Sequence, residues 1–208
     1  FGVGESDKPA PGDFDQYTVE HYREEVDAVR TEIGADTVHL YGQSWGGMLA
    51  LEYVLECPEH VESLILSNTL ASVQSAYESM KSVLDDLSTD NQKTIETAHE
   101  RRAFDDPEYE AALHPAYAKH VCRVEPFPDP VERTLDNVNT DIYGLMWGPN
   151  EFVLLEHARL RGWDVRDRLD EISTPTLVMT GSYDEISPDV AKEISEGILN
   201  NVGWGLKA

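Results

Sequence analysis

The stretch "YGQSWGGM", residues 41–48, decides how this sequence folds, because it contains the pattern G-x-S-x-G as Gly42-Gln43-Ser44-Trp45-Gly46. A β-prone run precedes the pattern at 37–41, and residues 46–56 favour a helix. A serine on such a strand–helix turn is lifted above the carboxyl ends of the strands as a nucleophile elbow. We predict that Gly42 and Gly46 are required because side chains there would collide. The alternative interpretation is an ordinary turn that contains a serine by chance.

The segments around this turn alternate between helix and strand. Residues 18–34 have one apolar helical face, and 61–66 form an apolar, β-prone run. After residue 163 a strand is expected at 176–180, and a helix follows from Pro188. This succession predicts a parallel α/β sheet. The tail "NNVGWGLKA", residues 200–208, does not have the pattern of a further strand.

A polar, helix-prone segment without a clear strand interrupts this alternation between residues 72 and 160. Apolar residues recur every three or four positions over 73–87 and again over 131–142, while Pro115 and three later prolines should break the middle. We therefore divide the chain into a first core part at 1–71, a helical cap at 72–160 and a second core part at 161–208.

The charge is strongly acidic: 16 basic and 40 acidic residues give a net charge of −24. Nucleic acid and anionic membranes are therefore improbable partners, since both need a basic face. The acids are spread along the chain, which fits either a halophilic protein of a salt-rich cytoplasm or an ordinary acidic cytoplasmic protein. The start shows no secretory signal, and no apolar run reaches the length of a membrane span. Cys57 and Cys122 have neither metal nor disulfide spacing and are expected to be free thiols.

Four stretches together resemble the proline iminopeptidases of the α/β-hydrolase superfamily. They are "FGVGESDKP" at 1–9, "GQSWGGMLALEY" at 42–53, "GPNEF" at 148–152 and "TLVMTGSYDEISP" at 176–188. The resemblance implies an α/β-hydrolase fold, a parallel sheet with helices on both faces and a helical cap. By the same comparison the sheet would be incomplete, because the chain looks truncated at both ends.

The resemblance also implies roles for five residues. Ser44 matches the nucleophile, Asp184 the acid that orients a histidine, and the amide of Trp45 one half of the oxyanion hole. Glu151 and Glu185 match the carboxylates that bind the substrate's free ammonium group. No cofactor and no metal are implied.

The histidine that should activate Ser44 is not found where the family would have it. The chain order is serine, acid, histidine, but none of the seven histidines follows Asp184. His39 is expected to pack against the sheet, and the four histidines within 72–160 are expected on the surface. We therefore expect the base beyond residue 208, the second oxyanion amide before Phe1, and a nearly inactive 208-residue chain.

The leading hypothesis is a serine aminopeptidase that releases N-terminal residues, preferentially proline, through an acyl-enzyme. Its substrate would be a short peptide or an amino-acid amide. The candidate walls of the proline pocket are Tyr143, Met146, Trp147 and Phe152, although packing in the core explains these four residues equally well. The alternatives are a carboxylesterase or another small-substrate hydrolase of the same fold, or a non-catalytic fragment. An esterase has no need of the two glutamates, so Glu151 and Glu185 separate these hypotheses.

Overall fold

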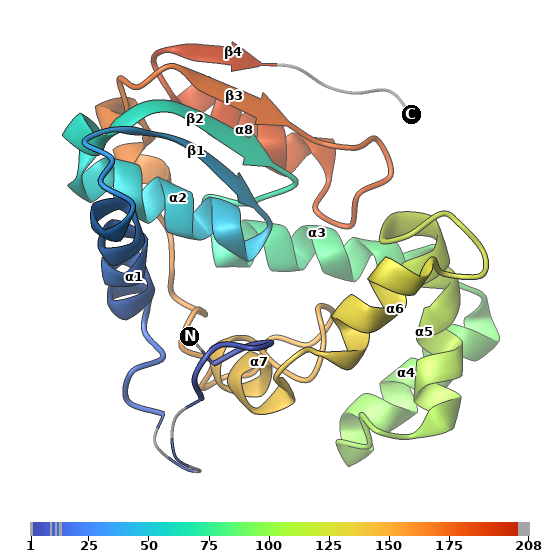
Figure 1. The fold of residues 1–208 in the computed structure, drawn as a ribbon. Helices are drawn as coiled ribbons and strands as arrows, with labels where there is room; N and C mark the ends of the chain where they lie inside the picture. The colour runs from blue at the N-terminus through green and yellow to red at the C-terminus, as the bar shows by residue number, and fades with distance from the viewer. Residues whose placement is uncertain (1, 9, 11, 13, 204–208) are drawn as a thin grey trace.

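A computed structural model describes residues 2–8, 10, 12 and 14–203. Four parallel strands form one sheet in the order β1-β2-β3-β4, so strands that follow one another in the sequence are also neighbours in space (Figure 1). Their bounds are β1 Val38–Gln43, β2 Val61–Ser67, β3 Thr176–Met179 and β4 Asn201–Gly203. The predicted parallel α/β fold is confirmed.

The last strand corrects the prediction for the tail. β4 pairs with β3 in parallel register, Thr176 opposite Asn201 and Val178 opposite Gly203. Asparagine and glycine have low strand propensity, which is why the sequence pattern does not show a strand there. The unpaired backbone groups along β3 offer a ladder that the tail occupies in spite of this propensity.

Three helices pack on the sheet: α1 Val19–Glu32, α2 Trp45–Glu56 and α8 Pro188–Gly197. The Thr18 hydroxyl caps α1 by accepting from the amide of His21 at 3.1 Å, and Pro188 stands in the first turn of α8, as predicted. α2 contacts β1 and β2, α8 contacts β3 and β4, and α1 packs on α2. Two short 3₁₀ segments, η1 Pro58–His60 and η2 Arg166–Glu171, precede β2 and β3.

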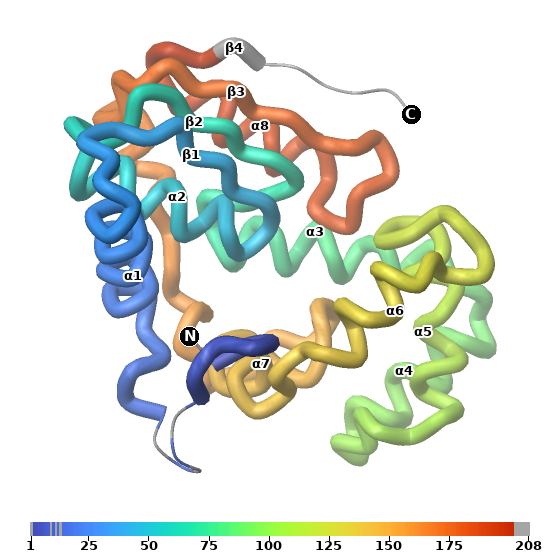
Figure 2. Tube along the Cα trace, viewed as in Figure 1, coloured from blue at the N-terminus to red at the C-terminus, as the bar shows by residue number. Residues whose placement is uncertain are grey.

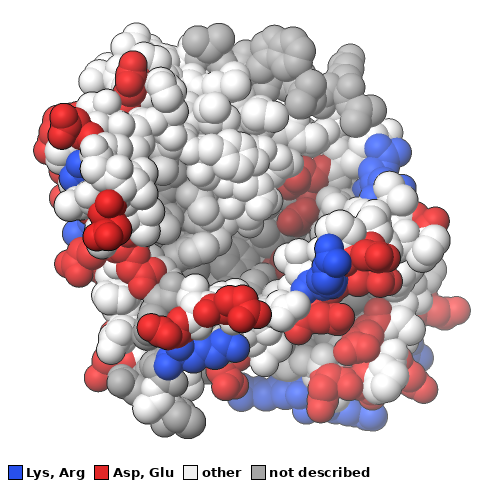
Figure 3. Space-filling model, in the orientation of Figure 1, with Lys and Arg blue, Asp and Glu red and all other residues white. Residues whose placement is uncertain are grey.

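Within the described residues these helices cover one face of the sheet, whereas the prediction placed helices on both (Figure 1). Leu64 and Leu66 of β2 are buried beneath α2 and α8, while Tyr41 on the opposite face of β1 is 60% exposed. His39 also lies on this open face, exposed and bonded through Nδ1 to the Ser63 hydroxyl at 2.8 Å, so its predicted packing role is wrong. Figure 3 shows the open side of the molecule as a largely uncharged, hollowed surface with acidic side chains around it.

The predicted apolar face of α1 is only partly covered. Tyr22 and Val26 are half-buried against neighbouring side chains, but Val29 and Ile33, at the carboxyl end of the helix, are 61% and 68% exposed. The helix therefore forms as its pattern predicts, but α2 covers it over part of its length.

Five helices fill the segment between β2 and β3, and they form a second layer beside the sheet (Figure 2). They are α3 Val73–Asp85, α4 Thr89–Arg101, α5 Pro107–His120, α6 Asp129–Asp136 and α7 Thr140–Met146. Pro115 lies inside α5 and does not break it. The periodic stretch 131–142 is two helices, because Asn139 caps α7 by accepting from the amide of Ile142 at 3.3 Å.

The chain enters and leaves this helical segment at one place. Ser72 and Asp164 form an isolated antiparallel bridge, and the amide of Val73 donates to the Trp163 carbonyl at 3.0 Å. This adjacency supports treating the segment as an insertion into one α/β domain, which we propose with the boundaries predicted above. Both cysteines are free. No helix in the described ranges combines the length and the apolar character that a membrane crossing requires.

Candidate active site

The turn after β1 holds Ser44 in a conformation that is rare for a side-chain-bearing residue. Its φ is 51° and its ψ is −122°, outside both the strand and the helix regions. The Ser44 carbonyl accepts from the amide of Gly47 at 2.9 Å and from the Thr69 hydroxyl at 2.7 Å. The Ser44 amide donates to the carbonyl of Asn68 at 3.1 Å, which ties the turn to the end of β2. Backbone strain concentrated at one serine is what a nucleophile elbow requires.

The steric reason for the glycines differs from the prediction at one position. A Cβ on Gly42 would collide with the Gly46 carbonyl and lie 2.7 Å from the Gly47 Cα, so Gly42 is required. A Cβ on Gly46 would point into open space, whereas one on Gly47 would lie 2.6 Å from the Thr69 Cγ2. The tight approach therefore involves Gly42 and Gly47, and the prediction for Gly46 is wrong in this respect.

Trp45 is the first residue of α2, so its amide belongs to the N-terminal turn of the helix, where N–H groups point away from the helix. Its ring meets the ring of Tyr22 edge-on at a centroid distance of 5.6 Å. This places the predicted oxyanion amide directly beside Ser44.

The loop after β3 places Asp184 at the same edge of the sheet. One carboxylate oxygen accepts from the amide of Ile186 at 2.8 Å, and the other accepts from the side-chain amide of Asn68. Burial raises the pKa of Asp184, while these two hydrogen bonds and the nearby His120 act in the opposite direction. Ser44, Asn68 and Asp184 thus follow the carboxyl ends of three adjacent parallel strands, the edge at which open α/β sheets bind ligands.

Asn68 is a site residue that the sequence reasoning missed. It has a left-handed φ of 50°, its amide donates to the Met179 carbonyl at 2.9 Å, and its side chain reaches Asp184. The available signal was its place, one residue after a predicted strand, combined with the tolerance of asparagine for positive φ.

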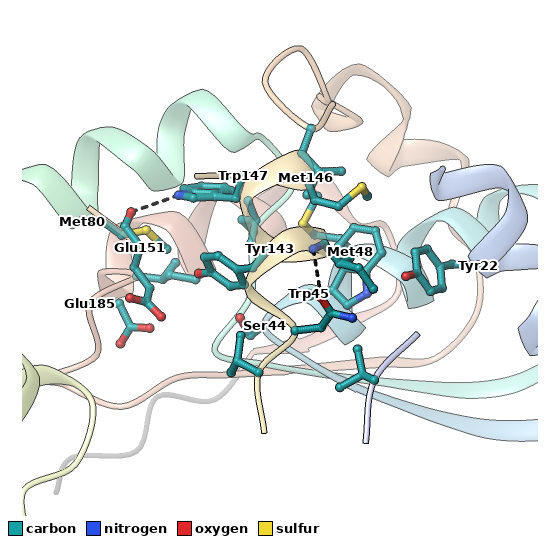
Figure 4. Close-up of a pocket in the computed structure, with 17 residues that line it drawn as sticks. Tyr22, Ser44, Trp45, Met48, Met80, Tyr143, Met146, Trp147, Glu151 and Glu185 are labelled. Carbon is teal, nitrogen blue, oxygen red and sulfur yellow. Dashed lines mark hydrogen bonds between the residues drawn. The ribbon is translucent and has the colours of Figure 1, made fainter. Parts of the chain in front are cut away.

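A cavity of about 370 Å³ opens at Ser44 and extends into the helical layer (Figure 4). Ser44 and Trp45 line it from the elbow, with Glu151 and Glu185 to one side of them and Tyr22 to the other. Three of the four predicted pocket walls also line it: Tyr143, Met146 and Trp147. Phe152 does not belong to its lining; it is 1% exposed and packs edge-on against Tyr117 at 5.6 Å, so that prediction is wrong.

Glu151 stands in a tight turn after α7. The Trp147 indole donates to the Glu151 carbonyl at 3.2 Å, and a Cβ on Gly148 would collide with the carbonyl of Val153. The Glu151 carboxylate accepts from the Tyr117 hydroxyl of α5 at 2.5 Å. The turn and the helix together point this carboxylate into the cavity.

Glu185 reaches the cavity from the acid loop. The Ser79 hydroxyl of α3 donates to the Glu185 carbonyl at 3.0 Å and accepts from the amide of Ser187 at 2.8 Å. Burial raises the pKa of Glu185 to about 7, and the charges of Asp184 and Glu151 add to that effect. Figure 4 shows the two carboxylates on the same side of the cavity, facing one space.

The seven histidines all lie among the described residues, and none of them lines the cavity. His120, at the end of α5, contacts the acid loop rather than serving as a surface residue. Its Nδ1 is 2.8 Å from the Tyr183 carbonyl, and its Nε2 is buried without a hydrogen-bond partner. The structure thus brings Ser44, Trp45, Glu151 and Glu185 around one cavity with Asp184 behind it, and it identifies no histidine partner for Ser44 within the described ranges.

Comparison with known proteins identifies the family of this chain. The α/β hydrolase fold family matches residues 1–204. A proline iminopeptidase of Lactobacillus delbrueckii subsp. lactis is 36% identical over 210 aligned residues, which include 100% of this chain and 70% of the relative. The chain belongs to the proline iminopeptidase family of α/β hydrolases.

Other members show how much of the family's length is present. The proline iminopeptidase of Saccharolobus solfataricus is 36% identical over 95% of this chain, and the match spans 63% of that relative's length. The crystal structure of VinJ superposes with a TM-score of 0.93 at 31% identity, covering 100% of this chain and 70% of VinJ. The chain therefore spans about two thirds of the length of the relatives it matches.

Proposed function

We propose that this chain carries the nucleophile and the substrate-binding part of a serine aminopeptidase that removes N-terminal residues, preferentially proline. One observation carries the proposal: a single cavity is lined by Ser44 and by two glutamates that face one space. Ser44 would attack the scissile carbonyl, the Trp45 amide would stabilise the oxyanion, and water would release the amino acid from the acyl-enzyme.

The two glutamates support an exopeptidase over an esterase. Glu151 and Glu185 face one space that is otherwise walled mostly by aromatic, aliphatic and methionine side chains. Two half-buried carboxylates that face each other are costly without a cationic partner, and a free N-terminal ammonium group supplies one. A neutral ester supplies none. The walls formed by Tyr143, Met146 and Trp147 suit the apolar ring of proline.

The proposed mechanism also needs a base that takes the proton from the Ser44 hydroxyl. Because no histidine of this chain lines the cavity, we propose that the 208-residue chain is by itself nearly inactive and that Asp184 orients a histidine from elsewhere in the gene product. The net charge of −24 supports an acidic cytoplasmic, salt-tolerant protein, which stays a prediction.

The test compares a prolyl amide with its N-acetylated form in a longer product of the same gene. Each hydrogen bond from the ammonium group to a carboxylate should be worth about 1.5–3 kcal/mol, so acetylation should lower kcat/KM about 10- to 150-fold for each such hydrogen bond that it removes. Glu151→Gln and Glu185→Gln should reduce this preference. Equal cleavage of the two substrates would contradict the proposal, and so would an unchanged preference in both variants.

A further inference from the structure

The two carboxylates at the end of the cavity differ in their hydrogen-bond partners. Glu151 accepts from the Tyr117 hydroxyl at 2.5 Å and from the phenol of Tyr143. Glu185 is held at its backbone carbonyl, which accepts from the Ser79 hydroxyl at 3.0 Å. A phenol from another helix therefore fixes the carboxylate of Glu151, whereas the contact from α3 fixes the backbone of Glu185.

The groups around Glu185 oppose a second negative charge. Asp184 is its neighbour in the acid loop, and Glu151 faces it from the turn after α7. Tyr143 faces it from α7 and Tyr117 stands behind Glu151 on α5, and burial beside Glu151 raises the pKa of both phenols, so they act as neutral donors. α3 contributes the uncharged Ser79.

The basic side chains near the acid loop, His120 and Arg123, contact Tyr183. His120, at the end of α5, is bonded to the Tyr183 carbonyl, and the Arg123 guanidinium lies 3.8 Å above the Tyr183 ring. Asp189, in the first turn of α8, is exposed. The cavity end therefore holds two facing carboxylates, while the His120 imidazole and the Arg123 guanidinium contact Tyr183.

We propose that Tyr117 is a positioning residue that holds the Glu151 carboxylate toward a ligand's ammonium group, and that Glu185 is the member of the pair that releases a proton when that ammonium group binds. The exchange balances: a neutral Glu185 carboxyl and an ammonium ion become a carboxylate–ammonium pair, and one proton passes to the solvent. This inference rests on the proposed recognition of a free amino terminus, and it assigns different roles to the two glutamates.

A pH dependence of ligand affinity follows. Affinity for an amino-terminal ligand should rise with pH up to about 7, where Glu185 loses its proton unaided. It should fall again when the ligand's own α-amino group, with a pKa of about 7.7–8.0, becomes neutral.

The experiment uses the 208-residue chain, which contains every residue of this site, with proline amide as the probe and N-acetylproline amide as its uncharged control. Calorimetry at pH 6.5 in two buffers with different ionisation heats counts the protons released. With a Glu185 pKa of about 7, roughly three quarters of a proton should be released per proline amide bound at that pH. Carbon-13 NMR of the glutamate carboxyls, with Glu185 assigned from its Gln variant, measures the titration without ligand.

Two variants separate the roles. Glu185→Gln should abolish the proton release while retaining weaker binding. Tyr117→Phe should weaken binding about tenfold or more, because Glu151 loses the donor that positions its carboxylate, and should retain the proton release from Glu185. Tyr53→Phe is the matched control, since Tyr53 donates a comparable hydrogen bond to Asp27 at 2.8 Å away from the cavity, and it should change neither quantity.

The outcomes are distinguishable. Equal binding of the two probes, or binding of neither, would overturn the proposed amino-terminal recognition and this inference with it. Preferential binding of proline amide with no proton release, with release that persists in Glu185→Gln, or with an unaffected Tyr117→Phe variant would overturn this inference alone. A Glu185 carboxyl that titrates near its ordinary value in the free chain would do the same.

Discussion

The elbow and the carboxylate pair lie in one cavity, but different interactions position them. Ser44 is placed by contacts between residues close in sequence or on the adjacent strand, chiefly the approach of Gly42 to Gly46 and the Thr69 hydroxyl bond. Glu151 and Glu185 are placed by Tyr117 and Ser79, which come from two separate helices of the insertion. The elbow depends on backbone geometry, whereas the recognition end depends on tertiary packing of the helical layer.

The two regions also differ in electrostatic cost. At the elbow, the cost is backbone strain at Ser44. At the carboxylate pair, the cost is burial and the repulsion between facing negative charges, which raise the pKa of Glu185 to about 7. Each region is less stable than it could be, and in each the cost falls on a residue that we propose acts on substrate. Four experiments, from the largest expected effect to the smallest, test this contrast.

The largest expected effect is on catalytic turnover, because no histidine lines the cavity in which the elbow places Ser44. Loss of the activating histidine costs about a million-fold in kcat in a comparable serine hydrolase. Prolyl-amide turnover by the 208-residue chain should therefore be near background when measured beside a longer product of the gene. Turnover within about tenfold of that product would mean that a histidine of this chain serves as base. His120→Ala would then be the first variant to examine, because His120 contacts the acid loop.

The second effect tests the geometry of the elbow with two nearby alanine variants. Gly42→Ala should lower the free energy of unfolding by about 3 kcal/mol or more, because its Cβ meets backbone that cannot yield cheaply. Gly46→Ala is the matched control, because a Cβ at this position of α2 would point into open space. This variant should leave the free energy of unfolding unchanged or raise it by up to about 1 kcal/mol. Urea unfolding followed by circular dichroism measures both. Equal destabilisation by the two variants would contradict the assignment of the close approach.

The third effect tests the cost of the carboxylate pair. The pKa of Glu185 is raised from 4.5 to about 7, so the folded state binds more protons than the unfolded chain between those values. The contribution of Glu185 to the free energy of unfolding is therefore most favourable below pH 4.5 and declines as pH rises to about 7. Glu185→Gln should remove this decline and stabilise the chain at pH 8 by up to about 3 kcal/mol.

The control for this measurement is Glu62→Gln, which alters an exposed carboxylate on β2 and should change the unfolding free energy by less than about 0.5 kcal/mol. Urea unfolding at pH 5 and pH 8 distinguishes the two variants. A Glu185→Gln chain that is no more stable than the wild type at pH 8 would show that ionised Glu185 does not destabilise the folded chain.

The smallest effect concerns Asn68, which joins the two regions. Asn68→Ala should destabilise the chain more than Asn68→Gly, by about 1 kcal/mol, because alanine is disfavoured at positive φ while both variants lose the bond to Asp184. Unfolding midpoints of the two variants measure the difference. If alanine proved as stable as glycine, the left-handed conformation at Asn68 would not hold in solution.

The sequence alone determined the order of elements, the parallel sheet and the elbow, because these depend on local periodicity and on the conformational freedom of residues next to one another. The helices α1 and α8 begin within a few residues of their predicted starts, since Thr18 caps the one and Pro188 stands in the first turn of the other. The family motifs, read as strings, also pointed to Ser44, Trp45, Glu151, Asp184 and Glu185, which the structure places at or beside one cavity.

Tertiary structure decided what these local rules do not encode. It placed β4 on β3 against its own strand propensity, left Val29 and Ile33 exposed on an apolar helix face, and set the close approach at Gly47 rather than Gly46. It also supplied Tyr117 as the partner of Glu151, Asn68 as the partner of Asp184 and His120 as the contact of Tyr183. Each of these pairs joins residues more than 30 positions apart, so only the packed chain brings them within hydrogen-bonding distance.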